Sequence, residues 1–178
     1  MQATPDHVAA SAAAGVEQAA AQAVPRYLTF AIGPERCATD IGAIREIIEV
    51  PQLTPVPMVP AVVRGVMNLR GAVVPVIDLS ARLGLGCTEI GRRSCVVIVE
   101  LGEGRGRQIL GVLVDAVQEV LEVPAAEVEP VPELGTRIHP ELIHGMAKIG
   151  DRLVTLLDLA RVLAEAELTR MVAGHAAH

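Results

Sequence analysis

An internal repeat constrains the possible folds of this chain more than any other feature of its sequence. Residues 65–83 align with residues 145–163 at a constant offset and without a gap, so that Gly65 meets Gly145 and Asp78 meets Asp158. A second block, residues 44–51, aligns in the same way with residues 117–124. The two blocks have the same order in both copies, and the extra residues of the second copy fall in an acidic, proline-containing segment. The repeat therefore predicts a duplicated structural unit.

The best-defined part of the first copy is residues 64–79, which predict a strand, a tight turn and a second strand. Asn68 to Gly71 form the expected turn, because Asn and Gly tolerate positive φ angles. Asp78 is placed to cap a short helix that Gly84 ends. Short strands with closely spaced turns favour a small barrel. The expected fold class is therefore mainly β, with two small barrels packed together.

The remaining pattern completes a single domain with two extensions. Further strands are expected at residues 27–32, 37–41, 44–50, 94–101, 108–115, 117–123 and 149–157. Asp158 is expected to cap a C-terminal helix that runs to about Val172. Residues 1–25 are rich in alanine and are expected to form a mostly disordered extension. The predicted division is the extension 1–25, a domain of two β-barrel subdomains over 26–172, and the tail 173–178.

Composition excludes several classes of partner and location. The hydrophobic fraction is 51%, but Tyr27 and Phe30 are the only aromatic residues, so aliphatic side chains must build the core. A net charge of −6 and the lack of stacking aromatics argue against nucleic acid as a partner. No apolar run reaches the roughly 18 residues needed to span a membrane, and no basic residue precedes Arg26 as a signal peptide requires. We expect a cytoplasmic protein without direct membrane insertion.

The sequence contains no pattern typical of an enzyme, a metal site or a cofactor site. Three cysteines without CxxC spacing indicate neither a disulfide framework nor a zinc site. His139 and His144 have the wrong spacing for a zinc-binding HExxH helix. The glycine-rich residues 102–106 precede a strand rather than a helix, so a hairpin turn is expected there and not a phosphate loop. We expect no catalytic residue, no metal and no cofactor.

The two copies differ where the first has Asn68 to Gly71 and the second has Lys148 to Asp151. Arg70 is therefore not explained by the shared scaffold, which favours a recognition role for it. Glu46 is expected on a neighbouring strand of the same unit, close enough to pair with Arg70. An exposed pair of this kind contributes only about 0–1 kcal/mol to stability. Its expected value lies in orienting the turn for a partner.

Residues 64–79 resemble the signature of CheW-type adaptor domains. In that signature a glycine precedes an Asn-Leu-Arg-Gly turn, which is followed by a Pro-Val/Ile-Ile/Val-Asp-Leu run. Residues 40–47, 109–115 and 142–145 resemble other blocks of the family, and the similarity covers about residues 26–165. The resemblance implies two five-stranded SH3-like barrels, strands that can be exchanged between the two halves, and a C-terminal helix.

The resemblance also implies a function. It implies a non-enzymatic scaffold that couples the cytoplasmic tips of methyl-accepting chemoreceptors to a CheA-type histidine kinase and controls the kinase. The protein would then lie in the cytoplasm at membrane-associated chemoreceptor arrays. The positions implied in receptor or kinase binding are Ile44, Glu46, Gly65, Asn68, Arg70 and Gly71. Apolar surfaces on both barrels are implied in kinase contact, without residues assigned to them.

Three other interpretations remain open from the sequence. The chain could be a CheW-like adaptor of a non-flagellar array that governs surface motility or a second messenger. A small metabolic enzyme on a duplicated barrel is a second class, disfavoured because no convergent polar site is visible. A self-assembling structural protein is a third class, which size-exclusion chromatography would reveal through large oligomers.

Overall fold

The computed structural model describes residues 24–132 and 136–164, and β-strands make up about half of these segments. The strands are β1 Arg26–Ile32, β2 Glu35–Asp40, β3 Ile44–Glu49, β4 Val63–Leu69, β5 Ala72–Asp78, β6 Cys95–Leu101, β7 Gln108–Val114, β8 Ala116–Glu122, β9 Val128–Glu129, β10 Ile143–Ile149 and β11 Arg152–Leu157. The helices are η1 Ile41–Ala43, α2 Leu79–Arg82, η2 Gly104–Gly106, η3 Ala125–Glu127, η4 Pro140–Leu142 and α3 Leu159–Val162. The structure thus confirms a mainly β protein with short helices.

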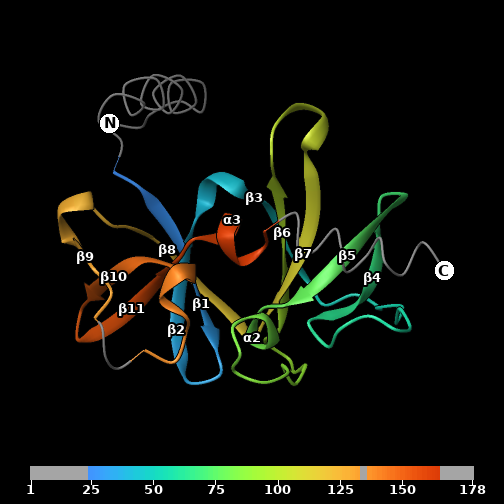
Figure 1. The fold of residues 1–178 in the computed structure, drawn as a ribbon, viewed down its shortest axis with the longest axis horizontal. Coiled ribbons are helices and arrows are strands. Elements are labelled where there is room, and N and C mark those ends of the chain that lie inside the picture. Colours follow the sequence, from blue (N-terminus) through green and yellow to red (C-terminus); the bar gives the residue numbers. More distant parts are fainter. Residues whose placement is uncertain (1–23, 133–135, 165–178) are drawn as a thin grey trace, which may run out of the picture.

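The strands form two strongly curved sheets, which are the two SH3-like barrels (Figure 1). The first sheet has the order β8-β1-β2-β11-β10-β9, and the second has the order β3-β6-β7-β5-β4. The sixth strand of the first sheet, β9, is only two residues long. Its counterpart in the second sheet is an isolated bridge between Thr54 and Val66. The prediction of two barrels is confirmed, with five main strands in each.

Strands are exchanged between the two halves of the chain. The N-terminal hairpin β1–β2 pairs with β8 and β11, which come from the C-terminal half. Conversely, β3 and β5 from the N-terminal half pair with the hairpin β6–β7. Neither barrel can therefore be assembled from one continuous half of the sequence.

The pairing registers show that the two barrels are copies of one unit. In the hairpin β4–β5, Val63 pairs with Ile77 and the register shifts just before Gly65. In the hairpin β10–β11, Ile143 pairs with Leu157 and the register shifts just before Gly145. Each position in the first hairpin is related to its counterpart in the second by the constant offset of the sequence repeat. The duplication inferred from the aligned blocks is therefore present in the structure.

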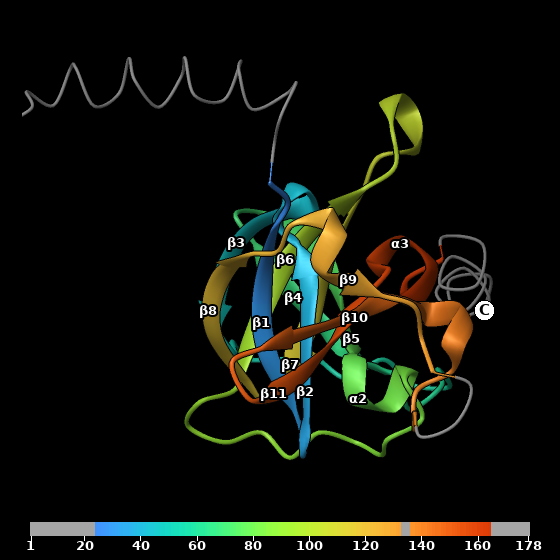
Figure 2. The same ribbon diagram turned by 90° about the vertical axis from the view of Figure 1, so that its left-hand side faces the viewer.

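The hydrophobic core consists of one cluster inside each barrel and a larger cluster between them. The interior of the first barrel contains Tyr27, Ala38, Val123, Ala147, Val154 and Leu156. The interior of the second contains Met67, Val74, Val76, Val96, Ile98 and Leu113. The cluster between the barrels includes Phe30 and Cys37 from the first sheet, Ile77 and Val97 from the second, and residues of both α2 and α3. Most residues of these three clusters therefore belong to the one between the barrels. The 90° view in Figure 2 shows α2 and α3 on one side of the strands.

Asp78 and Asp158 cap α2 and α3 as predicted, and Asp78 is in addition the centre of a buried network. Each side chain accepts a hydrogen bond from a backbone N–H of its helix. Asp78 is fully buried and also accepts bonds from the amide and hydroxyl of Thr88, each 2.8 Å long, and forms a 3.0 Å ion pair with Arg64. Asp78 therefore connects β4, α2 and the loop that follows α2.

Two sequence predictions need correction. The strand expected over residues 149–157 is interrupted at Gly150 and Asp151, where β10 turns into β11. The C-terminal helix begins after Asp158 as expected, but α3 ends at Val162 with Leu163 as its C-cap. Two segments lie outside the described residues. One is residues 165–178, which contain most of the predicted helix and the predicted tail, and the other is residues 1–23 of the predicted extension.

Candidate protein-interaction site

The turn between β4 and β5 is a tight hairpin turn with Arg70 at its tip. Leu69 pairs with Ala72, so Arg70 and Gly71 form a two-residue turn. Their φ angles are +52° and +89°, as a type I′ turn requires. The Oδ1 atom of Asn68 accepts a 2.9 Å hydrogen bond from the amide of Gly71. The sequence indicated Asn68 and Gly71 as the turn residues that tolerate a positive φ angle, whereas in the structure the first positive φ falls on Arg70.

Arg70 forms an ion pair with Glu46, as expected from the sequence. Its Nη2 atom lies 2.7 Å from Oε2 and 3.0 Å from Oε1 of the Glu46 carboxylate. The strands β3 and β4 that position these residues are the two edges of their sheet, not neighbours. The pair therefore connects the two edges where the barrel closes. The Arg70 side chain remains 73% exposed while that of Glu46 is 29% exposed, so the guanidinium is the more accessible of the two charged groups.

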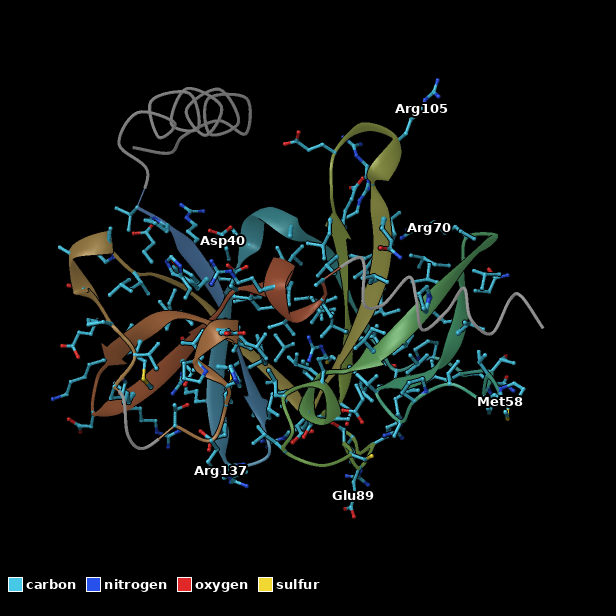
Figure 3. The ribbon with its side chains drawn as sticks, in the orientation of Figure 1. Asp40, Met58, Arg70, Glu89, Arg105 and Arg137 are labelled. Carbon is cyan, nitrogen blue, oxygen red and sulfur yellow. The ribbon has the colours of Figure 1, made fainter. Side chains whose placement is uncertain are left out.

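A hollow of about 360 Å³ lies beneath this ion pair. Arg45, Glu46 and Arg70 supply its charged groups. Its apolar walls come from Leu69, Val74, Ile98 and Ile109. Figure 3 shows Arg70 on the upper side of the second barrel, on the side from which the β6–β7 hairpin projects. This surface combines an apolar floor with exposed positive charge, which suits a partner carrying apolar and acidic groups.

The structure does not bring all six predicted positions together. Glu46, Asn68, Arg70 and Gly71 meet at the turn, as described above. Ile44 is half-buried and packs against the core between the barrels, so it does not line the hollow beneath Arg70.

Gly65 lies near the other end of β4, where the backbone of the proline-rich loop approaches closely. It has a φ angle of +146°, and a Cβ atom there would lie 2.5 Å from the carbonyl oxygen of Thr54. Gly145 is equally crowded in the second copy, where a Cβ atom would lie 2.5 Å from Cγ1 of Val128. Packing of the repeated unit therefore explains why position 65 requires a glycine, without any role in binding a partner.

A second hollow, also of about 360 Å³, lies between the barrels. It is lined by Tyr27, Thr39, Asp40, Gly42, Ala43, Leu101, His144, Leu157, Asp158, Leu159 and Ala160. Burial and the nearby charge of Asp40 raise the pKa of Tyr27, which keeps the phenol neutral. Ile44 follows directly after η1, which forms one edge of this hollow. No sequence pattern indicated this hollow, because its walls come from segments that lie far apart along the chain.

The described residues hold no group of three or more His, Cys, Asp or Glu side chains placed to bind a metal ion. The three cysteines are unpaired in the structure. Burial, with a smaller contribution from Glu35, raises the pKa of the Cys37 thiol to about 12. This thiol is therefore protonated and acts as part of the core between the barrels. No helix in the described part of the chain is long and apolar enough to cross a membrane.

The fold defines the class of protein: a β domain of two SH3-like barrels that are copies of one unit, share a core and carry a tight turn with an arginine at its tip. Comparisons with known proteins identify its family. The family model of the CheW-like domain matches residues 26–167. The chain therefore belongs to the CheW-like family, whose members include scaffold proteins of chemosensory signalling.

Individual relatives and a solved structure agree with this assignment. The chemotaxis protein CheW of Rhizobium meliloti (strain 1021) is 34% identical over 140 residues, which cover 79% of this chain and 88% of the relative. The chemotaxis protein CheW of Klebsiella aerogenes is 30% identical over 142 residues, covering 80% and 83% respectively. The crystal structure of the scaffolding protein TtCheW from Thermoanaerobacter tengcongensis matches with a TM-score of 0.69 and 32% identity, over 78% of this chain and 86% of that one.

Proposed function

We propose that the protein is a non-enzymatic adaptor that couples the cytoplasmic tips of chemoreceptors to a CheA-type histidine kinase and controls the kinase. It would act in the cytoplasm, at membrane-associated chemoreceptor arrays. Its membership of the CheW-like family supports this proposal. The single observation that carries it is the geometry of Arg70, whose backbone occupies a left-handed turn position and whose exposed side chain pairs with Glu46. Asn or Gly would be preferred there for the turn alone.

We assign receptor binding to the turn surface formed by Glu46, Asn68, Arg70 and Gly71. The type I′ turn, the Asn68 hydrogen bond and the Glu46 ion pair hold this surface in one conformation before a partner arrives. A preorganised surface loses little conformational entropy on binding, which favours affinity. Ile44 would act beside this surface, at the edge of the hollow between the barrels. Gly65 would contribute indirectly, by allowing the packing that holds β4.

We assign kinase binding to exposed apolar residues that the duplication places on both barrels. Ile47 and Val73 are exposed on the second barrel, and Val120 and Leu153 are exposed on the first. The two sets are equivalent in the repeat, because Ile47 aligns with Val120 and Val73 aligns with Leu153. Large exposed apolar side chains that recur at equivalent positions favour protein contacts at both ends of the molecule.

The receptor-binding assignment is tested by removing the guanidinium without disturbing the turn. Arg70→Asn preserves a type I′ sequence, because Asn-Gly is a preferred pair for that turn. We expect it to weaken binding to a purified receptor-tip fragment by about 10-fold or more, as is usual for a central arginine in an interface. Arg152→Asn is the matched control, since it removes an exposed arginine next to the equivalent turn of the other barrel.

The same variants are then assayed for stimulation of a CheA-type kinase together with the receptor. We expect Arg70→Asn to lose receptor-dependent control while still co-purifying with the kinase. Unchanged receptor binding by folded Arg70→Asn would contradict the assignment of the turn. Failure of the unmodified protein to bind either partner would contradict the adaptor function itself.

A further inference from the structure

The hairpin β6–β7 forms an arm that projects beyond the second barrel (Figures 1 and 2). Its tip, residues 102–107, is compact rather than open. Gly102 has a φ angle of +86° and lies so close to the carbonyl oxygen of Gly106 that no Cβ atom would fit. The short helix η2 is closed by hydrogen bonds from Gly106 to Glu103 and from Arg107 to Gly104. The arm therefore presents its side chains from a defined backbone.

Glu100 fixes the base of the arm to the strand that carries Glu46. Its carboxylate lies 2.6 Å from Nη1 of Arg45 on β3 and 3.1 Å from Nε of Arg107 on the arm. Arg45 lies at a β-bulge, where the register between β3 and β6 shifts. A bulge re-aims the side chain that it carries. Because Arg45 and Arg70 line the same hollow, the arm and the Arg70 turn belong to one continuous surface.

On this surface the arginines are exposed, whereas the two carboxylates that pair with them are largely covered; Glu103 at the tip of the arm is also exposed. The side chains of Arg45, Arg70 and Arg107 are 52%, 73% and 61% exposed, whereas those of Glu46 and Glu100 are 29% and 20% exposed. Arg105 lies at the end of the arm (Figure 3), is exposed, and has no ion-pair partner among the described residues. We call Arg70, Arg45, Arg107 and Arg105 the arginine strip. In a chain with a net charge of −6, the strip is a local cationic surface.

We infer that the arginine strip binds an acidic helical segment of the receptor tip and that the arm extends the binding surface beyond the Arg70 turn. Several exposed guanidinium groups on one surface can pair with carboxylates spaced along one face of a helix. The apolar floor of the hollow between Arg45 and Arg70 accommodates an apolar side chain of the same helix. The inference rests on the proposed adaptor function, because it names the receptor as the partner.

Two other anionic partners fit the strip less well. A membrane surface would be met by an amphipathic element with large apolar side chains, whereas the arm tip carries glycine, Glu103 and arginine. A nucleic acid would find no aromatic side chain on the strip on which to stack bases, because the two aromatic residues, Tyr27 and Phe30, are buried. A protein helix uses both the positive charge and the apolar hollow.

The experiment measures binding of a receptor-tip fragment to the full chain by fluorescence anisotropy, at low and high salt. Arg105→Glu reverses one charge at the tip, where the side chain supports no contact in the fold. Arg137→Glu is the control, because Arg137 is also exposed but lies on the opposite side of the molecule (Figure 3). We expect Arg105→Glu to weaken binding about 5- to 10-fold at low salt, mainly through slower association, and Arg137→Glu to have little effect. The difference in affinity between Arg105→Glu and the unmodified chain should shrink at about 0.5–1 M salt, where charge screening is strong.

The possible outcomes separate the inference from the function on which it rests. If Arg105→Glu binds the receptor fragment as the unmodified chain does while Arg70→Asn weakens it, the arm has no part in the interface and only the proposed function survives. If the unmodified chain does not bind the fragment, both fail. If Arg105→Glu loses binding to phosphatidylserine vesicles or to DNA but not to the receptor fragment, the strip serves a different partner and the inference is overturned.

Discussion

Arg70 combines a functional side chain with an unfavourable backbone conformation. Residues other than Gly and Asn lose roughly 1–2 kcal/mol in the left-handed region, and the exposed ion pair with Glu46 offsets only part of this cost. Arg70→Asn should therefore leave the protein as stable or raise its free energy of unfolding by about 0.5–1 kcal/mol. Arg70→Val is the opposite control, because a β-branched side chain is strongly disfavoured at φ +52°. Urea unfolding measures both, and a clear loss of stability in Arg70→Asn would show that the ion pair outweighs the strain.

The two helix caps offer a second comparison of single residues. Asp78→Ala removes a buried carboxylate, so that Arg64 loses its ion pair and the amide and hydroxyl of Thr88 lose their acceptor. We expect a loss of about 3–5 kcal/mol, as is usual when one member of a buried ion pair is removed. Asp158→Ala at the equivalent position removes a partly exposed cap and should cost about 1 kcal/mol. Similar losses in the two variants, measured by urea unfolding, would contradict the network described for Asp78.

The strand β4 depends on the close approach of the proline-rich loop at Gly65. Gly65→Ala places a Cβ atom against the Thr54 backbone, which cannot move aside without breaking the bridge to Val66. We expect a loss of about 2–4 kcal/mol together with faster hydrogen exchange at the Thr54 and Val66 amides. Gly145→Ala meets mainly the Val128 side chain, which can shift, and should cost less. If Gly65→Ala left stability unchanged but abolished receptor binding, Gly65 would be a contact residue and not a packing residue.

The molecule as a whole is built around the core between the barrels, and strand exchange ties both barrels to it. Cys37 lies fully buried in this core, and its thiol has a pKa raised to about 12 from an ordinary value of 9.0. A raised pKa in the folded state means that the thiol contributes stability below pH 9 that is lost as the pH rises toward 12. The free energy of unfolding should fall by up to about 1.4 kcal/mol per pH unit in this range because of Cys37.

Alkaline urea unfolding of three chains checks this pH dependence. Cys37→Ala should remove the contribution of this thiol to the slope of the unfolding free energy against pH. Cys87→Ala removes an exposed thiol and controls for the loss of a cysteine. An unchanged slope in Cys37→Ala would mean that the Cys37 thiol is not protected by the core.

We also expect a single unfolding transition for both barrels, because the core that joins them is larger than the cluster inside either one.

Local chemistry accounts for the features that could be predicted from the sequence. Asn68 to Gly71 carry turn residues, Asp78 and Asp158 are capping residues, and the aliphatic runs alternate as strands do. These preferences act over a few residues, so they can be recognised without knowing the fold. The duplication was equally accessible, because both copies still carry the same packing and capping residues at a constant spacing.

The remaining features depend on contacts between distant segments, and no local pattern encodes them. The pair of Glu46 and Arg70 was expected, but on neighbouring strands, whereas curvature of the sheet brings the two residues together from its opposite edges. The pairing of Leu69 with Ala72 determines which turn residue takes the first positive φ. Asp78 becomes the centre of a buried network only because the loop after α2 folds back to place Thr88 against it. Local propensities therefore specified the strands, turns and caps, whereas burial and strand pairing in three dimensions determined the exchanged barrels and the surface around Arg70.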